Sequence, residues 1–380
     1  MMGTRKSFLN KEEILADFSE CSSEKSVEIY EELEKEVLSL IKKKHKALIP
    51  VSNEAYDNAD SFLETYPDYD ISKLPSWITA DICQARVIGA SKQTIIMPDG
   101  RKYQLNNTLN HLSGGEWTYF TNSVINTAYK TTGADAYAHK IRKIHPTPKP
   151  PQLMKEIITF FTKEGELVFD YFMGVGGTLL GAGLCGRKAA GIELNRKYVD
   201  AYIAAAEEMK IPLYKTKIGD CMVELASEES MQYLTDGEPI SLVLIDPPYG
   251  NMMSREKTGA DIKVYGSVAT PFTDSDKDFG NLSLDIFFEK LMKSVELVLP
   301  YVKPKGHIVV FIKDLQPSGK ETNLLHARII NEINKIEKVN YKGLKIWADQ
   351  TAKLFPYGYP FSFVANQIHQ YILVFRKEKP

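Results

Sequence analysis

The chain has 380 residues, of which 43% are hydrophobic, so it is long enough for one large core and a smaller second unit. Its formal net charge of −2 excludes a uniformly basic protein, and any nucleic-acid-binding surface must be local. No run reaches the roughly 18 apolar residues of a membrane-spanning helix, and the first ten residues lack the apolar region of a signal peptide. We therefore expect a cytoplasmic protein without a membrane partner.

The four cysteines do not indicate a metal site or a disulfide framework. No two form a Cys-x-x-Cys pair, and none lies beside a histidine at the spacing of metal ligands. We expect Cys21, Cys83, Cys185 and Cys221 to be reduced thiols that pack inside the protein, and we expect no bound metal.

Residues 1–140 are predicted to form an N-terminal extension with helical and mixed structure. Within it, residues 11–47 are rich in Glu, Lys and Leu, and their apolar positions are spaced mostly by three and four, which predicts a helix. Two short apolar runs, 85–88 and 94–97, precede a Pro-Asp-Gly turn at 98–100 and indicate a hairpin. We interpret the extension as a region that recognises DNA or binds a partner.

Residues 141–380 are predicted to form the main domain, because strands and helices alternate along them. The run 240–245 is almost wholly apolar, as expected for a strand buried on both faces. This alternation predicts an α/β fold with a doubly wound, mostly parallel, Rossmann-like sheet. The predicted strands are 166–170, 189–193, 214–218, 240–245, 307–313 and 371–375, and the predicted helices are 153–161, 178–185, 198–210, 284–299 and 326–335.

A glycine-rich turn after the first of these strands indicates a nucleoside cofactor. The strand ends at Asp170, and Gly174 and Gly176 allow the backbone to turn sharply and approach a ligand closely. The next strand ends at Glu193, where a carboxylate is placed to accept hydrogen bonds from ribose hydroxyls. The third strand leads to Asp220, which is placed to accept from an adenine amino group. NAD, FAD and S-adenosylmethionine all fit this pattern.

The tetrapeptide Asp246-Pro247-Pro248-Tyr249 directly follows the buried strand 240–245 and is a candidate catalytic strip. Two prolines cannot continue the ladder, so the strand stops there with a stiff backbone. The Asp246 carboxylate and the Pro247 carbonyl can hold the two hydrogens of an aromatic amine, which frees its lone pair for attack on a methyl group. Tyr249 offers a flat face on which a base flipped out of a duplex can stack.

Together these motifs resemble the amino-methyltransferases of DNA, the family that modifies adenine N6 and cytosine N4. The resemblance covers roughly residue 140 to the C-terminus. The segment His145–Pro150 is similar to the family's tenth motif, Asp170–Gly177 to its first, Gly191–Asn195 to its second and Asp246–Tyr249 to its fourth. In the first motif Tyr171 replaces the usual proline, and Gly177 stands where threonine is frequent.

The resemblance implies transfer of a methyl group from S-adenosylmethionine to the exocyclic amine of a flipped base. Asp-Pro-Pro-Tyr is commoner in adenine enzymes than in cytosine enzymes, so site-specific DNA adenine-N6 methylation is favoured. The tenth motif of the family contacts the methionine part of the cofactor. The residues implied to bind S-adenosylmethionine are His145, Pro146, Thr147, Lys149, Asp170, Phe172, Gly174, Gly176, Glu193 and Asp220.

The region that reads the DNA sequence is not defined by these motifs. Their order matches the gamma arrangement, and the strand predicted at 371–375 is expected to be the last of the sheet. Recognition is therefore expected in residues 1–140, in the loop 251–281 or in a separate specificity subunit, and a homodimer is compatible with the sequence. The aromatic stretch 354–361 is expected to line the base pocket or to brace the last strand. The predicted DNA-binding residues are Lys140, Arg142, Lys143, Arg255, Lys257 and Lys263.

Three other functions are compatible with the motifs. The first is cytosine-N4 methylation of DNA. The second is guanine-N2 methylation of tRNA, since some enzymes of that class carry Asp-Pro-Pro-Tyr-Gly and Gly250 follows Tyr249 here. The third is a non-catalytic methyltransferase-like subunit, although the intact strip favours an enzyme. Restriction-modification, phage defence and solitary methylation are all compatible settings.

Overall fold

The computed structural model describes residues 56–89, 91–250, 273, 275–314 and 324–378. The helix predicted over residues 11–47 lies outside these residues. The chain divides into two compact units, one up to Asn106 and one from Asn107 onward. Each helix within the described ranges is too short or too polar to cross a membrane.

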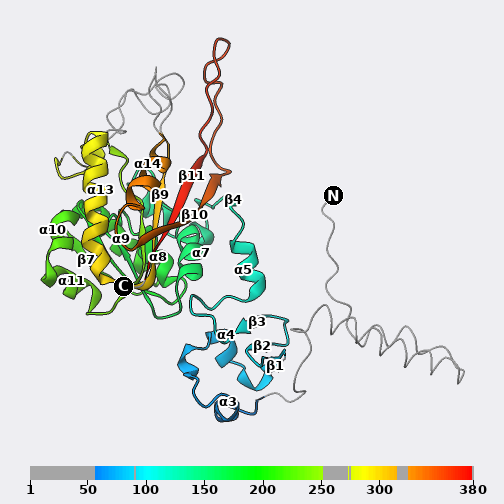
Figure 1. Cartoon of the computed structure of the whole chain (residues 1–380). Helices are drawn as coiled ribbons and strands as arrows, with labels where there is room; N and C mark the ends of the chain where they lie inside the picture. The colour runs from blue at the N-terminus through cyan, green and yellow to red at the C-terminus, as the bar shows by residue number, and fades with distance from the viewer. Residues whose placement is uncertain (1–55, 90, 251–272, 274, 315–323, 379–380) are drawn as a thin grey trace, which may run out of the picture. The chain divides into compact units, whose positions relative to one another are not determined.

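The smaller unit contains a short three-stranded antiparallel sheet packed with short helices (Figure 1). The two predicted apolar runs form the paired strands β1 and β2, with Val87 opposite Ile95, and the Pro-Asp-Gly turn joins β2 to β3. Its core is built around Phe62, Ile78 and Tyr103, which are fully buried. The elements are α3 (Ala59–Thr65), η1 (Ile71–Lys73), α4 (Ser76–Thr79), η2 (Ile82–Gln84), β1 (Arg86–Ile88), β2 (Thr94–Ile96) and β3 (Lys102–Gln104).

The boundary between the units differs from the one expected after residue 140. The segment that follows Asn106 belongs to the larger unit, because its strand β4 pairs in parallel with β10 of the main sheet. Neither strand was predicted, since β4 has only four residues and β10 mixes polar and apolar side chains. The elements concerned are α5 (Gly114–Phe120), β4 (Val124–Thr127), η3 (Ala134–Ala136), α6 (His139–Arg142) and β10 (Val339–Asp349).

The larger unit is built on an eight-stranded sheet with the order β4-β10-β11-β9-β8-β5-β6-β7. The strands from β5 to β9 run parallel, and β11 is antiparallel to β9. The predicted doubly wound, mostly parallel sheet is confirmed. The strand order reverses at β5, between β6 and β8, and such a switch point is where ligands bind in open α/β sheets. The remaining strands are β5 (Leu167–Asp170), β6 (Lys188–Glu193), β7 (Lys215–Ile218), β8 (Ile240–Ile245), β9 (Val302–Ile312) and β11 (His369–Lys377).

Helices cover both faces of this sheet (Figure 1). Because side chains alternate along a strand, Leu242 and Leu244 of β8 pack on one face, and Val243 and Ile245 pack on the other. The first face is covered by α7 (Pro151–Phe161), α8 (Gly177–Gly183) and α9 (Arg196–Met209), and the second by α10 (Cys221–Ala226), α11 (Glu228–Thr235), α13 (Leu284–Val298) and α14 (Leu325–Ile333).

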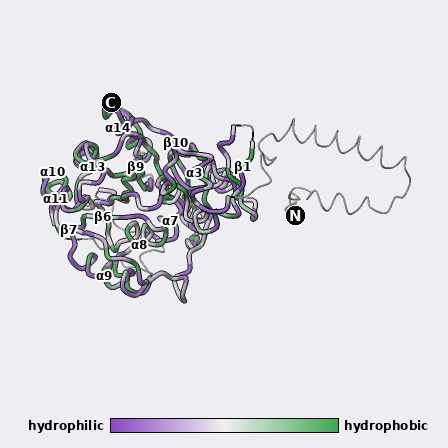
Figure 2. Tube along the Cα trace, turned by 90° about the horizontal axis from the view of Figure 1, so that it is seen from below, coloured by the Kyte–Doolittle hydropathy of each residue, from purple (hydrophilic) through white to green (hydrophobic). Residues whose placement is uncertain are grey.

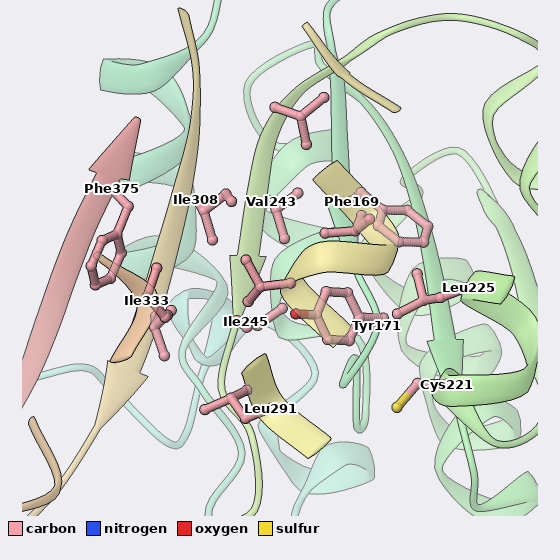
Figure 3. Close-up of a cluster of buried hydrophobic side chains, with 14 of the residues drawn as sticks. Phe169, Tyr171, Cys221, Leu225, Val243, Ile245, Leu291, Ile308, Ile333 and Phe375 are labelled. Atoms are coloured by element: carbon pink, nitrogen blue, oxygen red, sulfur yellow. The ribbon is translucent and has the colours of Figure 1, made fainter. Parts of the chain in front are cut away.

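The two layers can be followed in the other views. Figure 2 shows α7, α8 and α9 near β6 in the larger unit. Figure 3 shows part of the second face, where Val243 and Ile308 of the strands and Leu291 and Ile333 of the helices belong to one buried cluster. The strands of the switch point are therefore fixed from both sides, and their carboxyl ends are held in place.

Candidate active site

A pocket lies at the carboxyl ends of the five parallel strands, at the switch point of the sheet. Each of these strands contributes a residue at or just after its end to the lining of the pocket. These residues are Phe172 after β5, Glu193 at the end of β6, Asp220 after β7, Asp246 after β8 and Lys313 after β9.

The structure brings most of the predicted site residues together in this pocket. All four residues of the catalytic strip line it, namely Asp246, Pro247, Pro248 and Tyr249. Seven of the predicted cofactor residues also line it: His145, Thr147, Lys149, Phe172, Gly174, Glu193 and Asp220. Pro146, Asp170 and Gly176 do not line it.

Asp170 has a different role from the predicted contact with a cofactor. Its carboxylate is buried and accepts hydrogen bonds from the Phe172 backbone N–H at 2.9 Å and from the Thr178 hydroxyl at 2.5 Å. Burial raises the pKa of Asp170 to about 7. The carboxylate thus holds both ends of the glycine-rich turn. It supports the shape of the pocket but does not line it.

The glycines of the turn are needed for different reasons. Gly174 lines the pocket, and its N–H donates to Glu193 at 2.8 Å. Gly176 lies at the start of α8 with φ of +77°, and a Cβ there would stand 2.2 Å from the ring of Tyr202. The close approach at Gly176 is therefore to helix α9 rather than to a ligand, which corrects the sequence interpretation.

The two departures from the family's first motif have structural explanations. A side chain at Gly177 would place its Cβ 2.9 Å from the Lys149 carbonyl, so threonine does not fit there. Tyr171, in place of the usual proline, is buried in the core, and its hydroxyl lies 3.1 Å from the Ser294 hydroxyl (Figure 3). Both changes are accommodated by neighbouring residues of this chain.

The acidic end of the pocket is formed by Glu193 and Asp220. Glu193 accepts from the backbone N–H groups of Gly174 and Asn195, both at 2.8 Å, and burial raises its pKa to about 7. Asp220 caps α10 by accepting from the Met222 N–H at 2.9 Å. Each carboxylate has lone pairs beyond these bonds that a ligand's hydroxyl or amine could use.

His145 lies at the same end and is uncharged at neutral pH. Burial and the nearby Lys149 and Arg142 cations lower its pKa to about 3. Its Nδ1 accepts from the Thr147 N–H at 3.2 Å, so the proton of the neutral ring is on Nε2. The ring packs against Tyr198, with 4.9 Å between centroids.

The carboxylate of Asp246 is held from two sides. Its Oδ2 forms an ion pair with the ammonium of Lys149, which is only 8% exposed, and its Oδ1 accepts from the Tyr249 hydroxyl at 3.0 Å. Lys149 was predicted to contact the cofactor, but in the structure its charge is directed at the catalytic strip. Each oxygen of Asp246 still has one lone-pair direction available for a substrate amine.

Arg142 does not fit its prediction as a DNA-binding residue. Its side chain is 1% exposed, and its guanidinium donates to the Lys149 carbonyl. It therefore supports the loop that carries Lys149. Lys140 and Lys143 are exposed, and their contact with DNA stays a prediction. Arg255, Lys257 and Lys263 lie outside the described residues.

Sequence reasoning missed several residues of the pocket. Lys313 directly follows a predicted strand, so the rule that ligands bind at carboxyl ends could have found it. Gln370 lines the pocket from the start of β11, and no local pattern reveals that this strand lies beside β9. The other missed lining residues are Tyr171, Leu194, Tyr198, Gly219, Cys221, Thr273, Lys277, Asp278 and Phe279.

The aromatic stretch 354–361 neither lines this pocket nor braces the last strand. It belongs to the connection between β10 and β11, which projects from the sheet (Figure 1). Tyr359 is 80% exposed and Phe361 is 91% exposed. The expectation failed because both β10 and β11 extend toward this connection and carry it away from the core.

Comparison with known proteins identifies the family. The family model for DNA methylases that act at N6 and N4 matches residues 8–206, more than half of the chain. The chain belongs to the DNA methylase family. S-adenosylmethionine is the methyl donor of such a methyltransferase, and the match includes the tenth, first and second motifs described above.

The methylase is also similar to parts of RNA-modifying enzymes. A tRNA (guanine(10)-N2)-dimethyltransferase of Pyrococcus abyssi is 29% identical over 105 residues, which are 28% of this chain and 30% of the relative. The enzyme of the same name from Methanocaldococcus jannaschii is 27% identical over 154 residues, 39% of this chain and 42% of the relative. The chain thus spans less than half the length of these curated relatives.

Solved structures of methyltransferases match the chain at low similarity. TrmN from Thermus thermophilus is 12% identical, with a TM-score of 0.36, over 60% of this chain and 48% of that chain. The putative RNA methyltransferase PH1948 from Pyrococcus horikoshii is 17% identical, with a TM-score of 0.32, over 66% of this chain and 85% of that chain.

The buried position of Arg142 leads to a test of stability. Replacing Arg142 with alanine removes the donor to the Lys149 carbonyl and leaves a cavity, so we expect the free energy of unfolding to fall by about 2–4 kcal/mol. The neighbouring Lys143→Ala is a matched control, because this exposed side chain should change stability by less than about 0.5 kcal/mol. Urea denaturation measures both, and equal stability of the two variants would contradict the assignment.

Proposed function

We propose that this methyltransferase transfers a methyl group from S-adenosylmethionine to the exocyclic amine of a flipped base in DNA, with adenine N6 as the target. The observation that carries the proposal is that Asp246 and Pro247 share one pocket with Glu193 and Asp220. Two amine acceptors and two nucleoside acceptors thus line the same space at the switch point of the sheet.

The acidic end of the pocket is suited to the nucleoside half of the cofactor. Glu193 would accept from the ribose hydroxyls, and Asp220 would accept from the adenine amino group. His145 and Thr147 would lie beside the methionine part, as the tenth motif implies, and a neutral His145 avoids repulsion of the sulfonium charge. When bound, the cofactor supplies an electrophilic methyl group.

The strip acts on the amine of the base. Its nitrogen lone pair is delocalised into the ring, so the free amine is a poor nucleophile. Asp246 and the Pro247 carbonyl would accept its two hydrogens and favour a pyramidal nitrogen. As positive charge develops on that nitrogen, the Asp246 carboxylate stabilises it, and the surplus proton then leaves to Asp246 or to water. Lys149 and Tyr249 keep the carboxylate in a fixed orientation.

DNA reaches the pocket only if the base leaves the duplex. Tyr249 would stack on the extruded base. The exposed Lys140 and Lys143 would contact phosphates of the DNA backbone. Sequence recognition is assigned to the N-terminal residues, to the loop after the strip or to a specificity subunit. A second copy of the chain and a restriction-modification setting are both compatible with this function.

Guanine N2 of tRNA is the second candidate substrate. It is supported by the names of the two archaeal relatives and by Gly250 after the strip. The test is to incubate the protein with labelled S-adenosylmethionine and either unmethylated duplex DNA or total tRNA, and to identify the labelled nucleoside. N6-methyladenine in DNA is expected. Label that is found only on tRNA would overturn the DNA assignment.

Asp246 should be essential for transfer and dispensable for cofactor binding. We expect Asp246→Ala to lower kcat by about 100-fold or more, because the amine loses its main acceptor, while the Kd for S-adenosylmethionine changes little. Turnover measured by label transfer and Kd measured by calorimetry separate the two effects. Normal turnover in this variant would refute the mechanism.

This variant leaves the buried Lys149 charge without its partner, and that could unfold the protein. The double variant Lys149→Met with Asp246→Ala removes both charges and should keep the fold while remaining inactive. Asp285→Ala is the matched control, because this exposed carboxylate lies far along the chain on α13 and should leave turnover unchanged.

Glu193 gives cofactor binding a pH dependence. A carboxyl with a pKa of about 7 is largely protonated at pH 6, and the protonated group accepts hydroxyl bonds with only one oxygen. We expect affinity for S-adenosylmethionine to fall as the pH drops below 7, by at most about tenfold per pH unit. Glu193→Gln should bind weakly at all pH values and lose this dependence.

Stability of the free protein should change in the opposite direction. The folded pKa of Glu193 is above the ordinary value of 4.5, so its contribution is fully present below pH 4.5 and is lost as the pH rises through 7. Calorimetry of binding and thermal unfolding between pH 6 and 8.5 check both trends. A Kd that is constant over this range would contradict the role of Glu193.

A further inference from the structure

Two polar side chains that the proposed mechanism does not use line the pocket beside the catalytic strip. Lys313 is the first residue after β9, and Gln370 is the second residue of β11. Burial and the neighbouring Lys149 lower the pKa of Lys313, and no carboxylate of the described residues counters this. The amide oxygen of Gln370 is buried and has no hydrogen-bond partner in the described part of the chain.

Strand register places Lys313 and Gln370 opposite each other, beyond the end of β8. Ile245 of β8 is level with Val310 of β9, so Asp246 is level with Phe311, and Lys313 lies two residues further along the chain. Ile312 of β9 is opposite Tyr371 of β11. When this antiparallel register is continued by one residue, Lys313 is opposite Gln370.

The three side chains also share one face of the sheet. Residues two apart on a strand point to the same side. Leu244 lies two positions before Asp246, Phe311 two before Lys313, and Ile372 two after Gln370. All three of these apolar residues pack on the face of α7, α8 and α9. Asp246, Lys313 and Gln370 therefore lie on one face of three adjacent strands, with Lys313 opposite Gln370 and two residues beyond the level of Asp246.

The chemistry of these three side chains matches a base whose exocyclic amine is flanked by a ring nitrogen that accepts hydrogen bonds. A charged lysine has only donors. In adenine the neighbours of the amine, N1 and N7, are both acceptors. Guanine N2 is flanked by the N1–H donor and by N3 on the side of the sugar. Lys149 is engaged by Asp246, so Lys313 is the lysine on this face of the pocket that is left to donate to a base.

The unpartnered oxygen of Gln370 also fits a ligand-bound state. A buried acceptor without a partner is destabilising, so a partner in the working complex is favoured. Cross-strand neighbours stand close enough for their side chains to touch. An N–H of Lys313 can supply the missing bond once the lysine turns toward the base.

We propose that Lys313 donates to the ring nitrogen beside the exocyclic amine of the target base, and that Gln370 positions Lys313 by accepting another of its N–H bonds. This subsite rests on the proposed function, since it assumes that the amine is held at Asp246. It disfavours the N1–H edge of guanine, because a charged Lys313 offers no acceptor to that N–H.

A bisubstrate analogue tests this subsite without knowledge of the DNA recognition sequence. The probe is S-adenosylmethionine whose transferable carbon is bonded to N6 of adenine, and two companion probes replace N1 or N7 of that adenine with C–H. We expect Lys313→Met to weaken binding of the adenine probe by about 10- to 100-fold, the effect of one lost hydrogen bond to a charged group. One of the companion probes should bind the wild type as weakly as the adenine probe binds Lys313→Met. That companion probe should lose no further affinity in the variant.

S-adenosylhomocysteine serves as the control for the cofactor half, and its Kd should be unchanged by Lys313→Met. Gln370→Met should weaken the adenine probe less than Lys313→Met, and the double variant should be no weaker than Lys313→Met alone, since both act through one contact. Lys313→Arg should restore part of the affinity.

The outcomes separate this subsite from the proposed function. Equal weakening of the adenine probe and S-adenosylhomocysteine would show a structural role for Lys313 and overturn the subsite. Unchanged binding of the adenine probe, or tighter binding of a probe built on guanine N2, would also overturn it. Label transfer to DNA adenine by the wild type would leave the proposed function standing in the first two cases.

Discussion

The buried ion pair between Lys149 and Asp246 connects the two halves of the site. Asp246 stands at the end of a strand that is buried on both faces, where a lone carboxylate would be costly. Lys149 supplies the counter-charge from a loop nearly one hundred residues earlier in the chain. Its backbone is held by Arg142 and lies against Gly177, where a larger residue would not fit. The loop, the glycine-rich turn and the strip are thus fixed relative to one another.

This arrangement explains why the catalytic carboxylate can be both partly buried and oriented. An ion pair in this position contributes little net stability, because both charges lose their hydration. Its value is geometric, since Lys149 takes one oxygen and Tyr249 takes the other. The remaining lone pairs of the Asp246 carboxylate are therefore held in fixed directions. A base amine that enters the pocket meets an acceptor that does not need to reorganise.

The sequence predicted the positions of the chemistry better than the directions of the side chains. The apolar run before Asp246 and the motif spacing were sufficient to place the strip at a strand end of a parallel sheet. Motifs do not show what a side chain touches, so Asp170 and Gly176 were both assigned to a ligand. In the structure Asp170 holds the glycine-rich turn, and Gly176 leaves room for the ring of Tyr202. Arg142 was read as surface charge, and only tertiary packing shows it to be buried.

Long-range pairing was the other limit. Strand β4 is short and half-exposed, and β10 mixes Lys, Asn and Tyr with apolar residues, so neither carries the pattern of a strand until its partner is known. The unit boundary at Asn106 follows from this pairing and could not be read locally. Gln370 was missed for the same reason, because only the position of β11 beside β9 brings it to the pocket.

The charges of the pocket divide it into two parts that suit two different ligands. Glu193, Asp220 and Asp278 give one end an acidic character, which favours the hydroxyls and the positive charge of the methyl donor. Lys149 and Lys313 give the other end donors, and Asp246 lies beside them as an acceptor. A base that offers an amine next to a ring nitrogen is complementary to that order of acceptor and donor. Base choice therefore follows from which groups stand beside Asp246, and not from the strip alone.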